Sequence, residues 1–158
     1  MSDERQRPGR KIDSAEPSIG KTAKVVKESR ILIQSDLDIV EARQQGRTMA
    51  SQLGFTSSEL TLVATAISEL ARNIVAYASR GEITLKLVNH SEKQGIVVIA
   101  SDEGPGIRDI SLALQDGYST SRSLGMGLPG VRRLMDEFEI ETTLGQGTKV
   151  IVKKWTNG

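Results

Sequence analysis

The chain contains no cysteine and only one histidine, His90, among its 158 residues. The absence of cysteine excludes disulfides, thiolate metal sites and cysteine nucleophiles, and it favours an intracellular compartment. A Ser-His-Asp triad or a multi-histidine metal centre would depend on His90 alone, which lies in the polar, turn-like stretch 89–95. These two absences remove several common catalytic and metal-binding arrangements.

Aromatic residues are also scarce, at 3% of the chain, so the core has to be built from Ile, Leu, Val and Ala. No apolar run approaches the roughly 18 residues needed to span a membrane, and the N-terminus lacks the apolar middle region of a signal peptide. We therefore predict a cytoplasmic protein without a membrane partner. A length of 158 residues is the size of one domain.

Neither sign of charge is in excess, because 21 Lys and Arg residues stand against 20 Asp and Glu residues. Residues 1–28 hold seven of the bases and five of the acids, which leaves the rest of the chain close to neutral. We therefore expect no broad nucleic-acid-binding face and no nucleic-acid partner. Residues 1–28 also show no sustained periodicity, so we predict a disordered N-terminal tail at 1–28 and a folded domain at 29–158.

Periodicity and capping signals divide the folded part into helices and strands. The expected elements, in order, are a strand near 30–34, helices over 36–54 and 56–78, strands near 82–88 and 96–100, a short helix over 110–115, a helix over about 128–138, and two strands that meet at 145–147. Because helices and strands do not alternate strictly, we predict an α+β fold. It would be a two-layer sandwich with a mixed, mainly antiparallel sheet and helices on one face.

Glu69 and Asn73 are four residues apart on the long predicted helix, so their side chains project from the same face. A carboxylate can orient or deprotonate a hydroxyl, and a neutral amide oxygen can ligate Mg²⁺ without repelling bound phosphates. Residues of these types at helical spacing are equally typical of a solvated helix surface. The pair alone does not decide between the two interpretations.

Asp102 begins the loop Asp102-Glu103-Gly104-Pro105-Gly106 at the exit of a predicted central strand. A buried carboxylate at this point is costly unless it accepts hydrogen bonds, and the amino group of adenine is one such donor. The two glycines let the backbone approach a planar ring closely. A tight turn after a strand has the same composition, so the loop by itself leaves both interpretations open.

A third motif, residues 125–130, is rich in glycine and leads into a predicted helix near Pro129. A glycine-rich loop before a helix N-terminus presents unpaired backbone N–H groups and the positive end of the helix dipole, which favour an anion. The hydroxyl-rich segment 117–123 precedes it and suits a lid over nucleotide phosphates, with Arg122 as a candidate cation. The alternatives are a flexible connector and a solvated loop.

In this order the three motifs resemble the Bergerat or GHKL ATP-binding fold, shared by gyrase, Hsp90, histidine kinases and MutL, over about residues 29–155. Within that superfamily, residues 66–74, 102–107 and 125–138 look like those of the RsbT-type switch kinases of bacterial stressosomes. The resemblance implies a protein serine/threonine kinase that depends on ATP and Mg²⁺ and acts in bacterial stress signalling. The N-terminal tail is a departure from typical relatives.

The resemblance also implies roles for individual residues. Glu69 would act on the acceptor hydroxyl, Asn73 would hold Mg²⁺, and Asp102 would bind the adenine amino group. The ATP-binding residues that it implies are Asn73, Asp102, Gly104, Gly106, Ile107, Ser119, Thr120, Gly125, Met126, Gly127, Leu128, Gly130 and Thr148.

The partners implied by the resemblance are proteins. STAS-domain proteins of the RsbS and RsbR type would be the phosphorylated scaffold, and a PP2C-type phosphatase such as RsbU would be the output protein that the kinase activates. One alternative is an anti-sigma factor kinase of the RsbW and SpoIIAB type that binds a sigma factor. The other is a nucleotide-dependent binding module without phosphotransfer, although the presence of both Glu69 and Asn73 favours an active enzyme.

Overall fold

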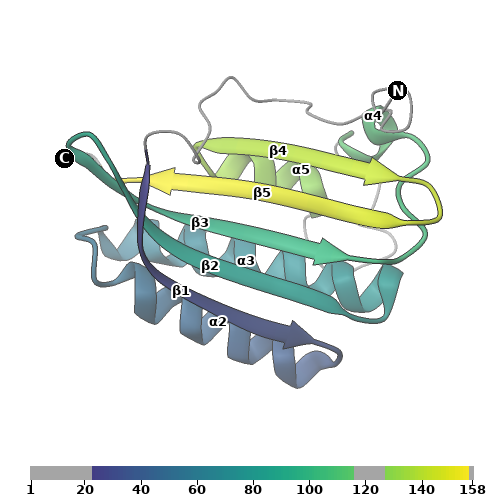
Figure 1. Ribbon diagram of the computed structural model, residues 1–158, viewed down its shortest axis with the longest axis horizontal. Coiled ribbons are helices and arrows are strands. Elements are labelled where there is room, and N and C mark those ends of the chain that lie inside the picture. Colours follow the sequence, from purple (N-terminus) through teal and green to yellow (C-terminus); the bar gives the residue numbers. More distant parts are fainter. Residues whose placement is uncertain (1–22, 116–126, 157–158) are drawn as a thin grey trace.

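The computed structural model describes residues 23–115 and 127–156 (Figure 1). In chain order its elements are β1 (Lys24–Ile33), α2 (Asp36–Ala50), α3 (Ser57–Ala78), β2 (Gly81–His90), β3 (Lys93–Asp102), α4 (Ile110–Ala113), α5 (Gly127–Leu134), β4 (Glu137–Thr143) and β5 (Gly147–Trp155). Among these described residues, no helix is both long and apolar enough to cross a membrane.

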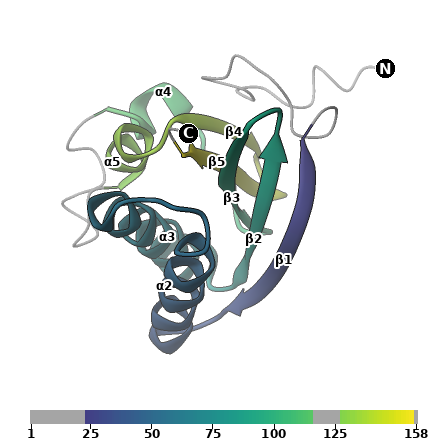
Figure 2. The ribbon, with the colours of Figure 1, turned by 90° about the vertical axis from the view of Figure 1, so that its left-hand side faces the viewer.

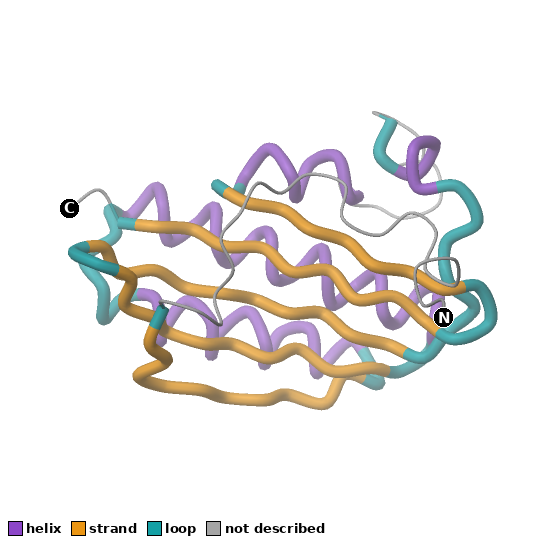
Figure 3. The backbone as a smooth tube through the Cα atoms, turned by 45° about the horizontal axis from the view of Figure 1, so that its top comes forward, coloured by secondary structure: helices purple, strands orange, loops and turns teal. Residues whose placement is uncertain are grey.

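The described strands form one sheet in the order β1-β2-β3-β5-β4, and each neighbouring pair is antiparallel. Helices α2, α3 and α5 lie on one face of this sheet (Figure 2). Figure 3 shows the strands running side by side in front of the helices. The predicted α+β two-layer sandwich is confirmed, with a sheet that is antiparallel throughout the described strands.

Helix α3 connects the two layers, because it packs against α2, α5 and several strands of the sheet. Its apolar stripe, with Ile67 and Leu70 almost wholly buried, faces a sheet core of Ile, Leu and Val as the composition predicts. The helix begins as expected: the Thr56 hydroxyl accepts a hydrogen bond from the Glu59 N–H, and the Glu59 carboxylate accepts one from the Thr56 N–H.

The first strand begins earlier than the sequence predicts. β1 starts at Lys24 and pairs with β2 from the Lys24–Asn89 partners onward, so residues 24–28 belong to the sheet and not to the tail. All five of these side chains are exposed, and a β-bulge interrupts the register between Val25 and Lys27. Backbone pairing holds this segment at the sheet edge, so it has no buried alternation by which the sequence could reveal it.

The last helix ends earlier than predicted, at Leu134 instead of near Phe138. Val131, Leu134, Met135 and Phe138 are spaced as on one helical face, which explains the error. In the structure Phe138 is a buried residue of β4, where burial alternates along the strand through Thr142. Pairing with β5 therefore overrides the helical spacing at this point.

Two truncations test where the folded domain begins. Deleting residues 1–22 is expected to leave the thermal midpoint unchanged. Deleting residues 1–28 removes the pairing of residues 24–28 with β2. At about 0.5–1.5 kcal/mol for each net hydrogen bond, this should lower the midpoint by roughly 5 °C or more. Circular dichroism melts of both proteins check this, and equal midpoints would show that the first half of β1 is dispensable.

Candidate functional site

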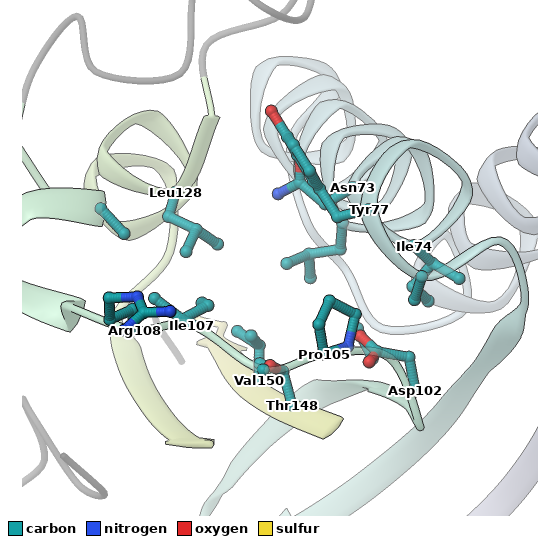
Figure 4. Close-up of a pocket in the computed structure, with 15 residues that line it drawn as sticks. Asn73, Ile74, Tyr77, Asp102, Pro105, Ile107, Arg108, Leu128, Thr148 and Val150 are labelled. Atoms are coloured by element: carbon teal, nitrogen blue, oxygen red, sulfur yellow. The ribbon is translucent and has the colours of Figure 1, made fainter. Parts of the chain in front are cut away.

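A cavity of about 280 Å³ opens between α3 and the sheet, at the end of the sheet where β3 ends and β5 begins (Figure 4). Its lining is mainly apolar with a few polar groups, as in most small-molecule sites. Six of the residues predicted to bind ATP line it: Asn73, Asp102, Gly106, Ile107, Leu128 and Thr148. Tertiary structure thus brings the separate motifs to one cavity.

Helix α3 contributes one continuous face to the cavity. Its lining residues follow the helical repeat and are Leu70, Asn73, Ile74, Tyr77 and Ala78. The prediction omitted Tyr77, although Tyr77 follows Asn73 by four residues, the same spacing that linked Asn73 to Glu69. That spacing could have identified it.

Asn73 is the polar group that α3 presents to the cavity. Its Oδ1 atom is buried and has no hydrogen-bond partner. An unpaired buried acceptor costs about 1–3 kcal/mol, so its presence calls for a ligand. Among the described residues, no cluster of three or more His, Cys, Asp or Glu could hold a metal ion. The unpaired, neutral Oδ1 atom of Asn73 is a suitable ligand for Mg²⁺, provided that nucleotide phosphates complete the coordination.

Glu69 lies one helical turn before Asn73 but does not line the cavity. Its side chain is buried, with Oε1 accepting a hydrogen bond from the Gly127 N–H at 3.3 Å and Oε2 lying 3.5 Å from Arg72 Nε. Gly127 is the first residue of α5, so this carboxylate ties α3 to the positive end of α5. Glu69 is therefore positioned beside the site and also has a structural contact.

Asp102 lies at the end of β3, opposite Thr148 on β5. Its Oδ1 accepts a hydrogen bond from the Gly104 N–H at 2.8 Å. Burial raises the pKa of Asp102, while backbone hydrogen bonds with Gly104 and Thr148 act in the opposite direction. A partly desolvated acceptor at the wall of a cavity is suited to an N–H donor such as the adenine amino group.

Gly104 and Gly106 allow the loop after β3 to pack closely against its neighbours. A Cβ at position 104 would lie 2.6 Å from the Cβ of Ala78, at the end of α3. Gly106 has a φ of +82°, and a Cβ there would lie 2.6 Å from the carbonyl oxygen of Thr143. Gly106 lines the cavity, whereas Gly104 shapes the turn without being among the lining residues.

Thr142 on β4 joins this loop to β5. Its hydroxyl accepts a hydrogen bond from the Ile107 N–H at 2.9 Å and donates one to the carbonyl of Gly147 at 3.2 Å. The Thr142 hydroxyl also lies 3.0 Å from the Thr148 hydroxyl, and either of the two can be the donor of that hydrogen bond. Sequence reasoning missed Thr142, because nothing in the sequence shows that a threonine in the strand before 145–147 contacts the loop after β3.

The glycine motif differs from the prediction. Gly127 and Gly130 lie inside α5 and not in a loop that precedes it, and neither lines the cavity. Gly127 has a φ of +71°, which marks the point where the chain enters the helix. The predicted residues Ser119, Thr120, Gly125 and Met126, and the candidate cation Arg122, lie outside the described residues.

Comparisons with known proteins agree with this geometry. Residues 34–154 match the histidine kinase-like ATPase domain. The chain is 49% identical to the serine/threonine-protein kinase RsbT of Bacillus subtilis (strain 168), over 81% of this chain and 96% of that protein. It is 34% and 37% identical to the anti-sigma F factors of Clostridium novyi (strain NT) and Thermoanaerobacter sp. (strain X514), each over 72% of this chain and 82% of the relative.

The variant Asp102→Asn separates nucleotide binding from stability. Loss of the charged acceptor should weaken ATP binding by about 1.5–3 kcal/mol, or roughly one to two powers of ten in the dissociation constant. The nucleotide-free variant should melt at a higher temperature than wild type at neutral pH, because burial of the ionised carboxylate opposes folding. Titration calorimetry and thermal melts measure the two effects.

The pH dependence follows from the raised pKa of Asp102. The ionised Asp102 carboxylate destabilises the folded wild-type protein fully above its folded-state pKa, and this effect fades as the pH falls through that pKa. The difference in melting temperature between Asp102→Asn and wild type should therefore narrow as the pH falls toward the ordinary pKa of 3.8. Asp136→Asn is the matched control, because Asp136 accepts a backbone hydrogen bond from Trp155 and does not line the cavity. Wild-type ATP affinity in Asp102→Asn would place the adenine elsewhere.

Proposed function

The chain belongs to the histidine kinase-like ATPase domain family, and on that premise we propose that it is an ATP- and Mg²⁺-dependent protein serine/threonine kinase that acts by partner switching. One observation carries the proposal: the unpaired Oδ1 of Asn73 and the partly desolvated carboxylate of Asp102 line the same cavity. These groups match the metal end and the base end of a Mg²⁺–nucleotide complex. A cytoplasmic location stays a prediction.

Nucleotide binding uses the cavity from end to end. Asp102 accepts the adenine amino group, while apolar residues such as Ile74 and Ile107 cover the faces of the ring. Thr148 also lines the cavity, and its hydroxyl oxygen, which is hydrogen-bonded to that of Thr142, keeps a lone pair to accept a further hydrogen bond. The base is therefore held by shape and by acceptors, which favours adenine over a base that presents a carbonyl at the same position.

Asn73 is the residue that would hold Mg²⁺, together with phosphate oxygens of the nucleotide. The metal supplies charge neutralisation for phosphoryl transfer, which depends on positioning and electrostatics more than on covalent chemistry. A neutral amide ligand adds no repulsion against the triphosphate. Asn73 thus fixes the phosphate end of the cavity one helical turn from Glu69.

Glu69 is the proposed catalytic residue, which orients the acceptor hydroxyl and accepts its proton. Its present contacts with Gly127 and Arg72 hold the carboxylate in one place beside the start of α5. The same carboxylate could serve only to join the two helices. A variant that keeps the hydrogen bond but removes the charge distinguishes these roles.

The proposed acceptors are STAS-domain scaffold proteins, and the proposed output is a PP2C-type phosphatase. Support comes from the resemblance of the three motifs to RsbT-type kinases and from the identity, which is 49% to RsbT against 34% and 37% to two anti-sigma F factors. Coverage of RsbT reaches 96% of its length. These values favour a STAS acceptor over a sigma factor as the partner.

Glu69→Gln tests catalysis. The amide oxygen can still accept the Gly127 N–H, so ATP affinity and the thermal midpoint should stay close to wild type, whereas phosphorylation of a STAS acceptor should fall by about 10²–10⁴-fold. Transfer of radiolabelled phosphate from ATP is the measurement. Glu59→Gln is the control, because Glu59 also accepts a backbone hydrogen bond on α3 but lies outside the ATP cavity. Normal transfer by Glu69→Gln would leave Glu69 a purely structural residue.

Asn73→Ala tests the metal assignment. ATP binding in the presence of Mg²⁺ should weaken by about tenfold or more, and addition of EDTA should then make little further difference. Asn89→Ala is a matched control, because Asn89 Oδ1 is likewise buried and unpaired but lies outside the ATP cavity. Calorimetric titrations with and without Mg²⁺ decide the question, and a retained Mg²⁺ dependence would contradict the assignment.

A further inference from the structure

Arg108 is the single cation among the described residues that line the ATP cavity. Its side chain is exposed, and the described part of the chain provides it with no hydrogen bond or ion pair. The other polar side chains of the lining include the neutral Asn73 and Thr148 and the acidic Asp102. Among the described lining residues, a polyanionic ligand would therefore meet positive charge only at Arg108.

The backbone on both sides of Arg108 is held in place. The Ile107 N–H donates to the Thr142 hydroxyl, and the Pro105 carbonyl accepts a hydrogen bond from the Gly145 N–H at 2.8 Å. On the other side, the Asp109 carboxylate caps α4 by accepting the Leu112 N–H at 3.1 Å. Asp109 is thus already engaged, and Arg108 projects from a short segment anchored at both ends.

The position of Arg108 in the cavity identifies what it can reach. Figure 4 shows Arg108 on the same side of the cavity as Leu128 of α5, with Asp102 on the opposite side. If adenine occupies the Asp102 end, the remainder of the nucleotide has to extend toward Arg108 and the start of α5. The ribose and phosphates, and not the base, then lie within reach of the guanidinium.

We propose that Arg108 binds the phosphate groups of the nucleotide and that it is the residue on this wall that distinguishes ATP and ADP from adenosine. The inference rests on the proposed function of the cavity. A guanidinium presents a planar fork of donors that matches two phosphate oxygens, and this geometry is stronger and more directional than a single ammonium contact. Arg108 has no hydrogen-bond or ion-pair partner among the described residues, so binding of a phosphate group would break no contact within that part of the chain.

The test compares ligands that differ only in phosphate. Wild type, Arg108→Gln and Arg108→Lys are titrated with ATP, ADP and adenosine by competition against a fluorescent ATP analogue. Arg108→Gln should bind ATP and ADP about 10- to 100-fold more weakly and adenosine equally well. Arg108→Lys keeps the positive charge but not the forked pair of donors, so its affinity for ATP and ADP should lie between those of wild type and Arg108→Gln. The salt dependence of ATP binding should be shallower for Arg108→Gln than for wild type.

Arg43→Gln is the matched control, because Arg43 is an exposed arginine on α2 and does not line the cavity. Thermal melts of all variants should coincide, since Arg108 has no described partner to lose. Equal weakening of adenosine and ATP would overturn the inference, because it would mean that Arg108 acts on the base or on folding. Unchanged ATP affinity would also overturn it, and loss of STAS phosphorylation alone would then assign Arg108 to acceptor docking.

The same titrations separate this inference from the proposed function. If wild type binds ATP and Arg108→Gln binds it equally well, only the role of Arg108 is lost. If wild type binds neither ATP nor ADP, the proposed function fails, and the role of Arg108 fails with it.

Discussion

The burial of α3 against the sheet is the interaction on which the rest of this structure depends. One stripe of the helix supplies residues to the core, and Leu70 and Ile74 of that stripe also line the cavity beside Asn73 and Tyr77. Burial of the apolar stripe therefore fixes the rotation of the helix, and rotation in turn fixes where Asn73 points. A hydrophobic constraint thus positions a polar group that would otherwise prefer water.

The opposite wall of the cavity depends on strand pairing and on the loop after β3. Antiparallel pairing places Asp102 across from Thr148, and the turn between β4 and β5 approaches the same loop through the hydrogen bond between Gly145 and Pro105. Thr142 adds side-chain hydrogen bonds that hold Ile107 and β5 together. The loop is therefore rigid because several backbone groups are satisfied within the fold, while its side chains remain available to a ligand.

Polar groups in this cavity are kept at some cost to the empty fold. Asn73 has a buried acceptor without a partner, and burial disfavours the charged form of Asp102. Such groups are expected where a ligand later supplies the missing donors or charge. Glu69 is different, because its carboxylate already contacts Gly127 and Arg72. Helix α3, which carries the proposed catalytic group, is thereby joined to α5, which contains Gly127 and Gly130 of the glycine motif.

The sequence by itself determined the layer architecture and the limits of α3. These features depend on local signals: the capping box at Thr56 and Glu59, the helical stripe, and apolar runs broken by turn residues. The order of the three motifs, through the resemblance that it carries, also pointed to Asn73 and Asp102, and both residues line the cavity. Local signals were misleading at Phe138, where helical spacing and strand alternation coincide, and they were silent for residues 24–28, which are held by backbone pairing alone.

Only the tertiary structure decided which residues face the cavity. Arg108 lines the cavity, but an exposed loop arginine has no sequence pattern that distinguishes it from a solvated one. Thr142 does not line the cavity, yet it holds the backbone of the loop that does. The tertiary structure likewise shows that Glu69 contacts Gly127 instead of lining the cavity, and that Gly127 and Gly130 lie inside α5. Side-chain direction and contact are set by how helices and strands pack across the core, and that packing joins residues whose separation in sequence carries no information about their distance in space.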